Sequence, residues 1–334
     1  LRFSPHFKTH QSLEIGRWFQ DTGVSGITVS SLEMAAYFAS EWDDITVAFP
    51  VNLLEIGTIN RLARKIRLQL LIESAEAVHF LGQHLKAAVG FFIKTDTGYH
   101  RTGIDSQNTA AIEAVIEAAA RYPLLSFKGF LTHNGHTYKC RKPEDVEAIH
   151  RHSLKELVRL KSAYSAQYPD LIISLGDTPS CSICNDFDGI DEIRPGNFVF
   201  YDLTQVAIGS CQPGQIAVAL ACPVVALHPE RDEMVIYGGG VHLSKDFLPT
   251  PPGVSYGQLA HPTEKAWGAP VEGVWIKSLS QEHGIVHLPS ALQSSYKVGD
   301  WVYVLPIHSC MTANLMKNFL SLSGNKIGMM PPLG

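Results

Sequence analysis

The sequence predicts an α/β fold in which a (β/α)8 TIM-type barrel is followed by a smaller, mainly β C-terminal domain. Strand-like and helix-like segments alternate over the first two thirds of the 334 residues, and eight strand candidates occur there. This alternation is typical of a parallel sheet, and eight units favour a closed barrel. An open doubly wound sheet has the same local pattern, but no Gly-x-Gly-x-x-Gly turn follows an early strand.

The strand candidates of the first domain are short runs rich in apolar and β-branched residues. They are the stretch that ends at Lys8, followed by 26–30, 45–49, 68–72, 88–94, 127–132, 171–175 and 192–200. Amphipathic stretches between them predict helices. The clearest of these lie at 13–21, 31–40, 109–121 and 143–168.

The sequence pattern of the last third of the chain is different. Strand patterns there are separated by Gly- and Pro-rich turns, and no long helical pattern occurs. The expected strands lie at 215–227, 233–237, 271–276, 285–288 and 300–305. The change places the domain boundary near residue 205. We therefore predict a barrel domain at 1–205 and a β domain at 206–334.

Composition limits the classes of protein to consider. Hydrophobic residues make up 45% and charged residues 18%, as in a globular protein, and the net charge of −5 gives no reason to expect nucleic acid as a partner. No apolar run is long enough to span a bilayer. Six irregularly spaced cysteines indicate reduced thiols and a cytoplasmic location. Because Leu1 already lies in a strand-like stretch, we expect a leading segment before it.

The stretch 4–11 reads Ser-Pro-His-Phe-Lys-Thr-His-Gln. On a strand, His6, Lys8 and His10 would share one face. A lysine held away from water loses affinity for its proton, which suits a Schiff-base former or a general base. The alternative is a charged residue near a fraying chain end.

Polar turns follow the later strand candidates, at the end where a barrel of this class has its active site. The turn around Thr178 and the turn 194–197 are rich in glycine and offer backbone N–H groups and a hydroxyl to a phosphate. A lysine and a phosphate site at the same rim predict pyridoxal 5′-phosphate (PLP). Lys8 would then form the imine, and the turns would hold the phosphate.

The second domain contains a His-x-Cys pair, His308 and Cys310, just after a strand candidate. On a strand these side chains would face the same way and could hold one ion. Imidazole and thiolate suit Zn²⁺ better than magnesium or manganese, although the same spacing also arises by chance. The polar cluster at 281–284 could add a further ligand.

Taken together, the motifs resemble the D-serine dehydratase and D-threonine aldolase family of fold-type III PLP enzymes, which share the alanine-racemase-like barrel. The matching stretches lie in order at 5–10, 96–103, 131–135, 174–179, 192–197, 281–284 and 306–310. The resemblance implies a cofactor site and a metal site. Their residues are Lys8 on the cofactor, Arg101, His133 and Tyr138 around its ring, Thr178, Gly196 and Asn197 at its phosphate, and His308 and Cys310 on the metal.

Members of that family are usually homodimers, so we expect a homodimer here. The sequence departs from the family at Gln11, where a second lysine is common, and at Asp177, where a small polar residue is frequent. A negative charge at Asp177 would disfavour a nearby phosphate unless the side chain points away from it.

We therefore expect a PLP- and zinc-dependent dehydratase that converts a small D-3-hydroxy amino acid into a 2-oxo acid and ammonia. Cys310 favours a dehydratase because family aldolases typically have a carboxylate at that position. The alternatives are a metal-dependent D-threonine aldolase, an amino-acid racemase, and a PLP carrier without catalysis. Candidate substrates are D-serine, D-threonine and D-3-hydroxyaspartate.

Overall fold

The computed structural model describes residues 1–251 and 253–331. The chain divides into two compact units, residues 1–196 and 197–334. No helix in the described part of the chain combines the length and the apolar character needed to cross a membrane.

The first unit is built on a parallel sheet, and residues 4–7 connect the two edges of that sheet. The N–H of His6 donates to the carbonyl oxygen of Pro195 (2.9 Å), and the N–H of Phe7 donates to that of Thr28 (2.8 Å). Eight parallel strands therefore curl into the predicted barrel architecture, and the predicted fold class is confirmed. In pairing order the strands are β1 (Arg2–Phe3), β9 (Glu192–Ile193), β8 (Ile172–Leu175), β7 (Leu125–Thr132), β5 (Val89–Asp96), β4 (Arg67–Ile72), β3 (Asp44–Pro50) and β2 (Ile27–Val29), while β6 (Ile104–Asp105) pairs with β5 alone.

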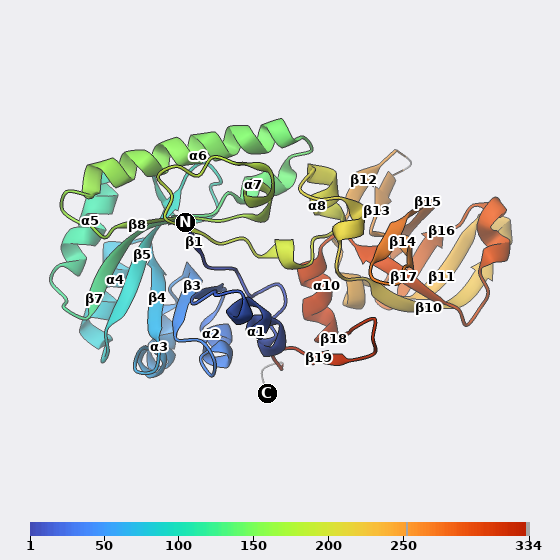
Figure 1. The fold of residues 1–334 in the computed structure, drawn as a ribbon, viewed down its shortest axis with the longest axis horizontal. Helices are drawn as coiled ribbons and strands as arrows, with labels where there is room; N and C mark the ends of the chain where they lie inside the picture. Colours follow the sequence, from blue (N-terminus) through green and yellow to red (C-terminus); the bar gives the residue numbers. More distant parts are fainter. Residues whose placement is uncertain (252, 332–334) are drawn as a thin grey trace. The chain divides into compact units, whose positions relative to one another are not determined.

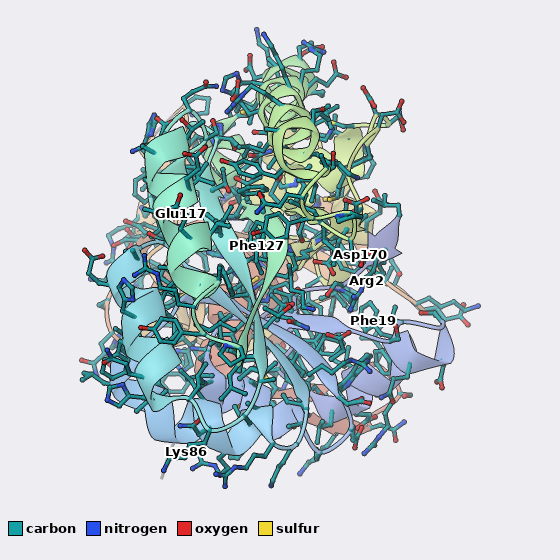
Figure 2. The ribbon with its side chains drawn as sticks, turned by 90° about the vertical axis from the view of Figure 1, so that its left-hand side faces the viewer. Arg2, Phe19, Lys86, Glu117, Phe127 and Asp170 are labelled. Carbon is teal, nitrogen blue, oxygen red and sulfur yellow. The ribbon has the colours of Figure 1, made fainter. Side chains whose placement is uncertain are left out.

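The helices of this unit lie outside the strands (Figure 1). Figure 2 shows the same arrangement from the side, with Glu117 on an outer helix and Phe127 among the strands. Several helices begin at a Ser, Asn or Asp side chain that accepts a backbone N–H of the first turn, which fixes where they start. The helices are α1 (Leu13–Asp21), α2 (Leu32–Phe38), α3 (Ile56–Ala63), α4 (Ala75–His84), α5 (Thr109–Ala119), α6 (Pro143–Tyr164) and α7 (Thr178–Ile183).

The strands are apolar because their residues are buried on both faces. In β5, for example, every residue from Val89 to Thr95 is buried, as expected for a parallel sheet covered by helices. The apolar core of the unit lies between this sheet and the helices. Its fully buried side chains include Phe38, Ile45, Leu70, Phe91 and Phe130.

The second unit contains a closed antiparallel barrel with its own core, which includes Met234, Ile276, Val286 and Val304. The predicted mainly β domain is confirmed. Its barrel strands, in pairing order, are β10 (Leu220–His228), β11 (Glu233–Tyr237), β16 (His283–His287), β15 (Trp267–Leu279), β14 (Gly257–Pro262) and β17 (Trp301–Pro306).

Shorter elements complete the second unit. They are the helices α8 (Leu203–Ile208), α9 (Gly240–Leu243) and α10 (Ser309–Met316), and the paired strands β12 (Leu248–Thr250) with β13 (Gly253–Ser255) and β18 (Asn318–Leu320) with β19 (Lys326–Gly328). Short 3₁₀ helices occur in both units. They span Leu53–Glu55, Gly135–Lys139, Asn197–Val199, Pro213–Gln215, Pro229–Arg231 and Ser290–Ser295.

Candidate active site

Lys8 lies in a turn at the carboxyl end of the first strand. The backbone N–H of Lys8 donates to Nδ1 of His6 (3.3 Å), and the side-chain amide of Gln11 donates to the Lys8 carbonyl oxygen (3.2 Å). The expected strand through residue 10 is therefore wrong, because the chain turns at residues 7–10 and His10 does not share a strand face with Lys8. Lys8 is exposed, which differs from the expectation of a lysine held away from water.

His10 anchors this turn in the apolar core. Its ring is 1% exposed and packs edge-on against Phe7 and Phe38, while Nδ1 accepts the backbone N–H of Ser12 (3.1 Å). Burial lowers the pKa of His10 to about 3. His10 is therefore a neutral structural residue that holds one end of the Lys8 turn.

Two further imidazoles, those of His6 and His133, lie close to the Lys8 ammonium group. Burial, followed by the positive charge of Lys8, holds the pKa of each well below its usual value. Nδ1 of His133 donates to the carbonyl oxygen of Gly176 (2.5 Å), so Nε2 of His133 carries a lone pair. His133 directly follows β7, and the structure thus brings it and Lys8 together at the barrel rim, as predicted by their positions after strands.

The aromatic ring of Tyr99 lies among the residues predicted around the cofactor ring. The guanidinium carbon of Arg101 lies 5.0 Å from the centre of the Tyr99 ring, and the His133 and Tyr99 ring centres are 6.1 Å apart. The ring of Tyr138 lies 6.3 Å from that of His133. Arg101, His133 and Tyr138 are therefore neighbours. The sequence reasoning gave Tyr99 no role, although it belongs to the same motif as Arg101.

Asp177 caps helix α7 with its carboxylate. Its Oδ2 accepts the backbone N–H of Ser180 (2.8 Å) and the hydroxyl of Thr137 (3.0 Å). Burial nevertheless raises the pKa of Asp177. Thr178, the predicted phosphate ligand, is the buried first residue of this helix. Because Ser180 and Thr137 donate hydrogen bonds to the Asp177 carboxylate, an acidic residue fits into a turn that is predicted to bind phosphate.

Gly176 and Gly196 allow the turns after β8 and β9 to approach their neighbours closely. A Cβ on Gly176 would lie 2.8 Å from Cβ of Arg194, and a Cβ on Gly196 would lie 2.9 Å from Cβ of His6. Each contact is too short for any side chain. These glycines bring the candidate phosphate turns next to each other and next to the chain that leads to Lys8.

Arg194 is a buried cation beneath this rim. Its Nε donates to Oγ of Ser174 (2.7 Å), and Nη2 donates to the carbonyl oxygen of Thr132 (2.5 Å). The carboxylate of Glu192 lies 3.9 Å away, and both side chains are 3% exposed. The charge of Arg194 also helps to lower the pKa of His6. The sequence pattern indicates Arg194 only as part of a turn, because its partners Ser174 and Thr132 come from two other strands.

In the second unit, His308 and Cys310 meet, but on a helix and not on a strand. β17 ends at Pro306, His308 caps α10, and Cys310 lies in its first turn. The strand geometry assumed for this pair is therefore wrong, although a hydrogen bond does join the two side chains. Burial opposes protonation of His308. Hydrogen bonds to Asp246 and Cys310 outweigh this effect of burial and raise the pKa of His308 to about 10. Oδ2 of Asp246 lies 3.3 Å from Nδ1 of His308.

The side-chain amide of Asn197 contacts this pair. Its Nδ2, which carries two hydrogens, lies within hydrogen-bond distance of Oδ2 of Asp202 (2.8 Å), Oγ of Ser309 (3.0 Å) and Sγ of Cys310 (3.4 Å). The predicted role of Asn197 at a phosphate stays a prediction. Among the described residues, no cluster of three or more His, Cys, Asp or Glu side chains could hold a metal ion. A metal at this position would therefore have two protein ligands, and the cluster at 281–284 adds none.

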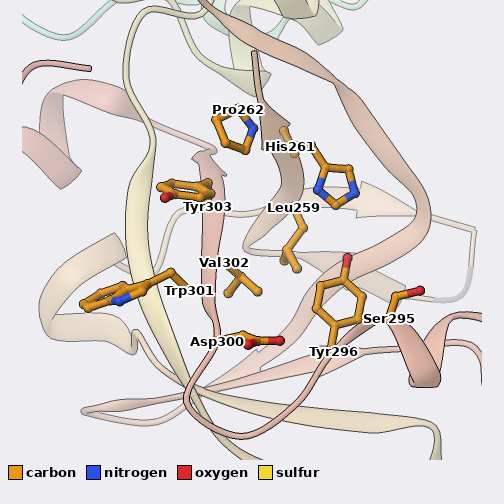
Figure 3. Close-up of a pocket in the computed structure, with 10 residues that line it drawn as sticks. Leu259, His261, Pro262, Ser295, Tyr296, Asp300, Trp301, Val302 and Tyr303 are labelled. Atoms are coloured by element: carbon orange, nitrogen blue, oxygen red, sulfur yellow. The ribbon is translucent and has the colours of Figure 1, made fainter. Parts of the chain in front are cut away.

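A cavity of about 270 Å³ opens elsewhere in the second unit, between β14, β17 and the segment before β17 (Figure 3). Its lining includes His261, Tyr296, Trp301 and Tyr303. The ten residues that line it include none of the predicted site residues. The predicted site residues lie instead at the barrel rim and at the His308–Cys310 pair, where titratable groups gather.

The barrel, its lysine turn and the separate β unit define an alanine-racemase-like protein. The sequence model of the alanine racemase N-terminal domain matches residues 5–203, and that of the serine dehydratase domain matches residues 217–322. The chain belongs to the D-serine dehydratase and D-threonine aldolase family of alanine-racemase-like PLP enzymes, and the predicted resemblance is confirmed. It is an enzyme of the PLP-dependent lyase class.

Curated relatives match over almost the whole chain. A D-serine dehydratase from Dictyostelium discoideum is 28% identical over 94% of this chain and 85% of its own length. A D-threo-3-hydroxyaspartate dehydratase from Delftia sp. is 26% identical over 97% of this chain and 88% of its own length.

Solved structures share the fold. The D-threo-3-hydroxyaspartate dehydratase from Delftia sp. HT23 superposes with a TM-score of 0.89 at 24% identity, covering 99% of this chain and 90% of that chain. A D-threonine aldolase from Filomicrobium marinum superposes with a TM-score of 0.81 at 18% identity, covering 98% and 88%.

Proposed function

We propose that this protein is a PLP- and zinc-dependent dehydratase that converts a small D-3-hydroxy amino acid, such as D-serine, into a 2-oxo acid and ammonia. The observation that carries the proposal is the contact between His308 and Cys310 in a chain that also has a lysine turn at the rim of a barrel. Curated relatives named for D-serine and D-threo-3-hydroxyaspartate dehydration support the reaction class.

The residues at the rim fit PLP. The Lys8 amine is exposed at the carboxyl end of the first strand, with His133 nearby, and Gly176 and Gly196 let the turns after β8 and β9 approach their neighbours closely. Lys8 would hold the cofactor, Arg101, His133 and Tyr138 would surround its ring, and Thr178, Gly196 and Asn197 would hold its phosphate. PLP, when bound, supplies an electron sink that makes the Cα proton of an amino acid removable.

The chain's own groups divide the remaining work. The Lys8 amine, once free, would accept the proton from Cα as a general base. The uncharged His133 ring, held by Gly176, presents an unprotonated Nε2 and adds no positive charge beside the amine. The buried Arg194 joins β8 and β7 by hydrogen bonds to Ser174 and Thr132.

The donor set in the second unit fits zinc. A thiol and an imidazole in contact are soft ligands, and Zn²⁺ on His308 and Cys310 would supply a Lewis acid for departure of the substrate β-hydroxyl. Two solved variants of a D-threo-3-hydroxyaspartate dehydratase support a metal in a relative of this chain. One has a cysteine replaced by alanine and is in the metal-free form, and the other has a histidine replaced by alanine.

The proposal includes a homodimer in the cytoplasm. The family resemblance supports the dimer. The six cysteines are free thiols in the described structure, which supports a reducing compartment.

The experiment is product analysis on PLP-loaded protein with D-serine, D-threonine and D-threo-3-hydroxyaspartate, with and without a chelator. We expect ammonia together with pyruvate, 2-oxobutanoate or oxaloacetate, and loss of these products on chelation. Glycine and an aldehyde would support the aldolase instead, and interconversion of enantiomers would support a racemase. Turnover that persists in Cys310→Ala at the wild-type rate would contradict a catalytic metal on this pair.

Lys8→Ala provides a check that does not depend on turnover. We expect this variant to lose the visible absorbance of the lysine-bound cofactor, whereas Lys86→Ala, an exposed lysine in the same unit, should keep it. A wild-type protein with this absorbance but no product from any substrate would support the carrier alternative.

A further inference from the structure

The sulfur of Cys310 has a buried amide as its neighbour. Nδ2 of Asn197 lies 3.4 Å from Sγ, and Asn197 is 4% exposed. An amide N–H is a donor, whereas a metal-bound thiolate sulfur carries negative charge and accepts hydrogen bonds. The contact therefore has the polarity that a metal-bound cysteine requires.

The orientation of this amide is fixed by Asp202. The Oδ2 atom of Asp202 accepts from Nδ2 of Asn197 (2.8 Å) and from the backbone N–H of Ser309 (3.0 Å), and Oδ1 accepts the N–H of Gln205 (3.0 Å). If the amide were flipped, its oxygen would face the Asp202 carboxylate, so only the observed orientation is favourable. Asp202 is 1% exposed, and it therefore ties the starts of α8 and α10 to the amide that faces Cys310.

His308, the other member of the pair, also has a hydrogen-bonding neighbour. Oδ2 of Asp246 lies 3.3 Å from Nδ1 of His308 and also accepts the hydroxyl of Ser244 (2.8 Å). A carboxylate on Nδ1 leaves Nε2 of the imidazole for a metal. Asp246 is about half-exposed, whereas Asn197 and Asp202 are buried. The stronger support is therefore on the cysteine side.

We propose that Asn197 is a positioning residue for the metal site, which holds the Cys310 sulfur in its metal-binding orientation and stabilises the negative charge of the bound thiolate. The inference rests on the proposed function, because it concerns the metal on His308 and Cys310. Asn197 acts through Cys310, and Asp202 acts through Asn197. This role differs from the phosphate contact that the family resemblance implies for Asn197.

The test measures metal binding directly. Co²⁺ and Zn²⁺ affinities are determined by competition with a chelator, and the thiolate-to-cobalt charge-transfer absorbance reports the bond from Cys310. We expect Asn197→Ala to lower the affinity for both metals by roughly 10- to 100-fold, as removal of a group that hydrogen-bonds to a metal ligand does in other proteins. The charge-transfer band should shift as well. Asn197→Asp, which places a carboxylate beside the sulfur and Asp202, should weaken binding further.

Asn318→Ala is the matched control, because it makes the same change in the same unit at an exposed side chain, whose Nδ2 donates to the carbonyl oxygen of Met316 (3.0 Å). It should bind both metals as tightly as the wild type. Circular dichroism verifies folding of each variant. If Asn197→Ala does not fold, Asn197→Gln, which keeps the amide but displaces it by one methylene, takes its place with the same expected direction.

The outcomes separate the two proposals. A wild-type protein that binds no Co²⁺, or binds it without the charge-transfer band, contradicts the metal assignment and the inference with it. A wild-type protein that shows the band, together with folded Asn197 variants of unchanged affinity and unchanged band, overturns the inference alone.

Discussion

The rings of Phe7 and His10 lie edge to face, with 4.4 Å between their centres. Because His10 is buried, its pKa is about 3 in the folded protein, against 6.5 in an unfolded chain. The unfolded state therefore binds more protons as the pH falls below 6.5. The stability contributed by the neutral ring is complete above that pH and is lost toward pH 3, by about 1.4 kcal/mol per pH unit.

We therefore expect the unfolding free energy of His10→Leu to depend less steeply on pH between about pH 6 and pH 4 than that of the wild type. Urea unfolding at a series of pH values measures this slope. His152→Leu changes an exposed histidine on α6 and should leave the slope unaltered. Equal slopes in wild type and His10→Leu would show that His10 is not the acid-sensitive group.

Gly129 in β7 pairs with Ile172 in β8. Its φ is +141°, and a Cβ there would lie 1.9 Å from the carbonyl oxygen of Ile172. We expect Gly129→Ala to destabilise the protein by about 3 kcal/mol or more, since backbone atoms must move apart. Gly57→Ala on α3, where an added Cβ meets no described atom within 4 Å, should instead stabilise by up to about 1 kcal/mol. Urea midpoints of the two variants test the contrast.

Asp177 combines a favourable cap with an unfavourable charge. Burial raises the pKa of the Asp177 carboxyl. The stability that the protonated carboxyl contributes is therefore complete below pH 3.8, and it is lost as the pH rises and the carboxyl ionises. Asp177→Asn keeps an oxygen for Ser180 and Thr137 and removes the charge, so it should be at least as stable as wild type at pH 7. Asp177→Ala should lose about 1–2 kcal/mol with the cap. Thermal unfolding at neutral and acid pH distinguishes these outcomes.

Arg194 and Glu192 form a buried pair inside the barrel. Arg194→Met removes the buried one of two charges that face Glu192, the other being the more exposed Arg2 at 3.3 Å, so we expect a loss of up to about 3 kcal/mol in the free energy of unfolding. Glu192→Gln combined with Arg194→Met should recover part of that loss. A double-mutant cycle from urea unfolding measures the coupling. Strictly additive effects would show that the 3.9 Å contact contributes no net interaction.

The local patterns predicted the two-unit architecture because the apolar composition of the strands indicates their burial. The run from Val89 to Thr95 is continuously buried, and a stretch of that kind has few alternatives to a central parallel strand. β14 was not predicted because Gly257 and Pro262 bound a short segment without clear alternation. The turn after His6 was read as strand because its shape depends on hydrogen bonds to Pro195 and Thr28, which no local pattern reveals.

The candidate site was predictable where motif residues act through their own chemistry. Lys8, His133 and the His308–Cys310 pair were found from residue type and position, although the assumed strand geometry of the pair was wrong. Their supporting residues were not found. Asn197 is separated from Cys310 by 113 positions, and the carboxylate of Asp246 reaches His308 from a different segment, so neither contact leaves a periodic signal in the sequence.

The segment 4–7, which hydrogen-bonds to β2 and to Pro195, also sets the order of events in biosynthesis. During synthesis Lys8 leaves the ribosome long before strand β9, because β9 lies near the end of the first unit in the sequence. The lysine turn therefore acquires its native shape as the last strand docks, in a contact of long sequence separation. A chain that lacks Pro195 cannot form the hydrogen bond from His6 that precedes Lys8, so a native conformation of residues 6–8 reports that the whole unit has folded.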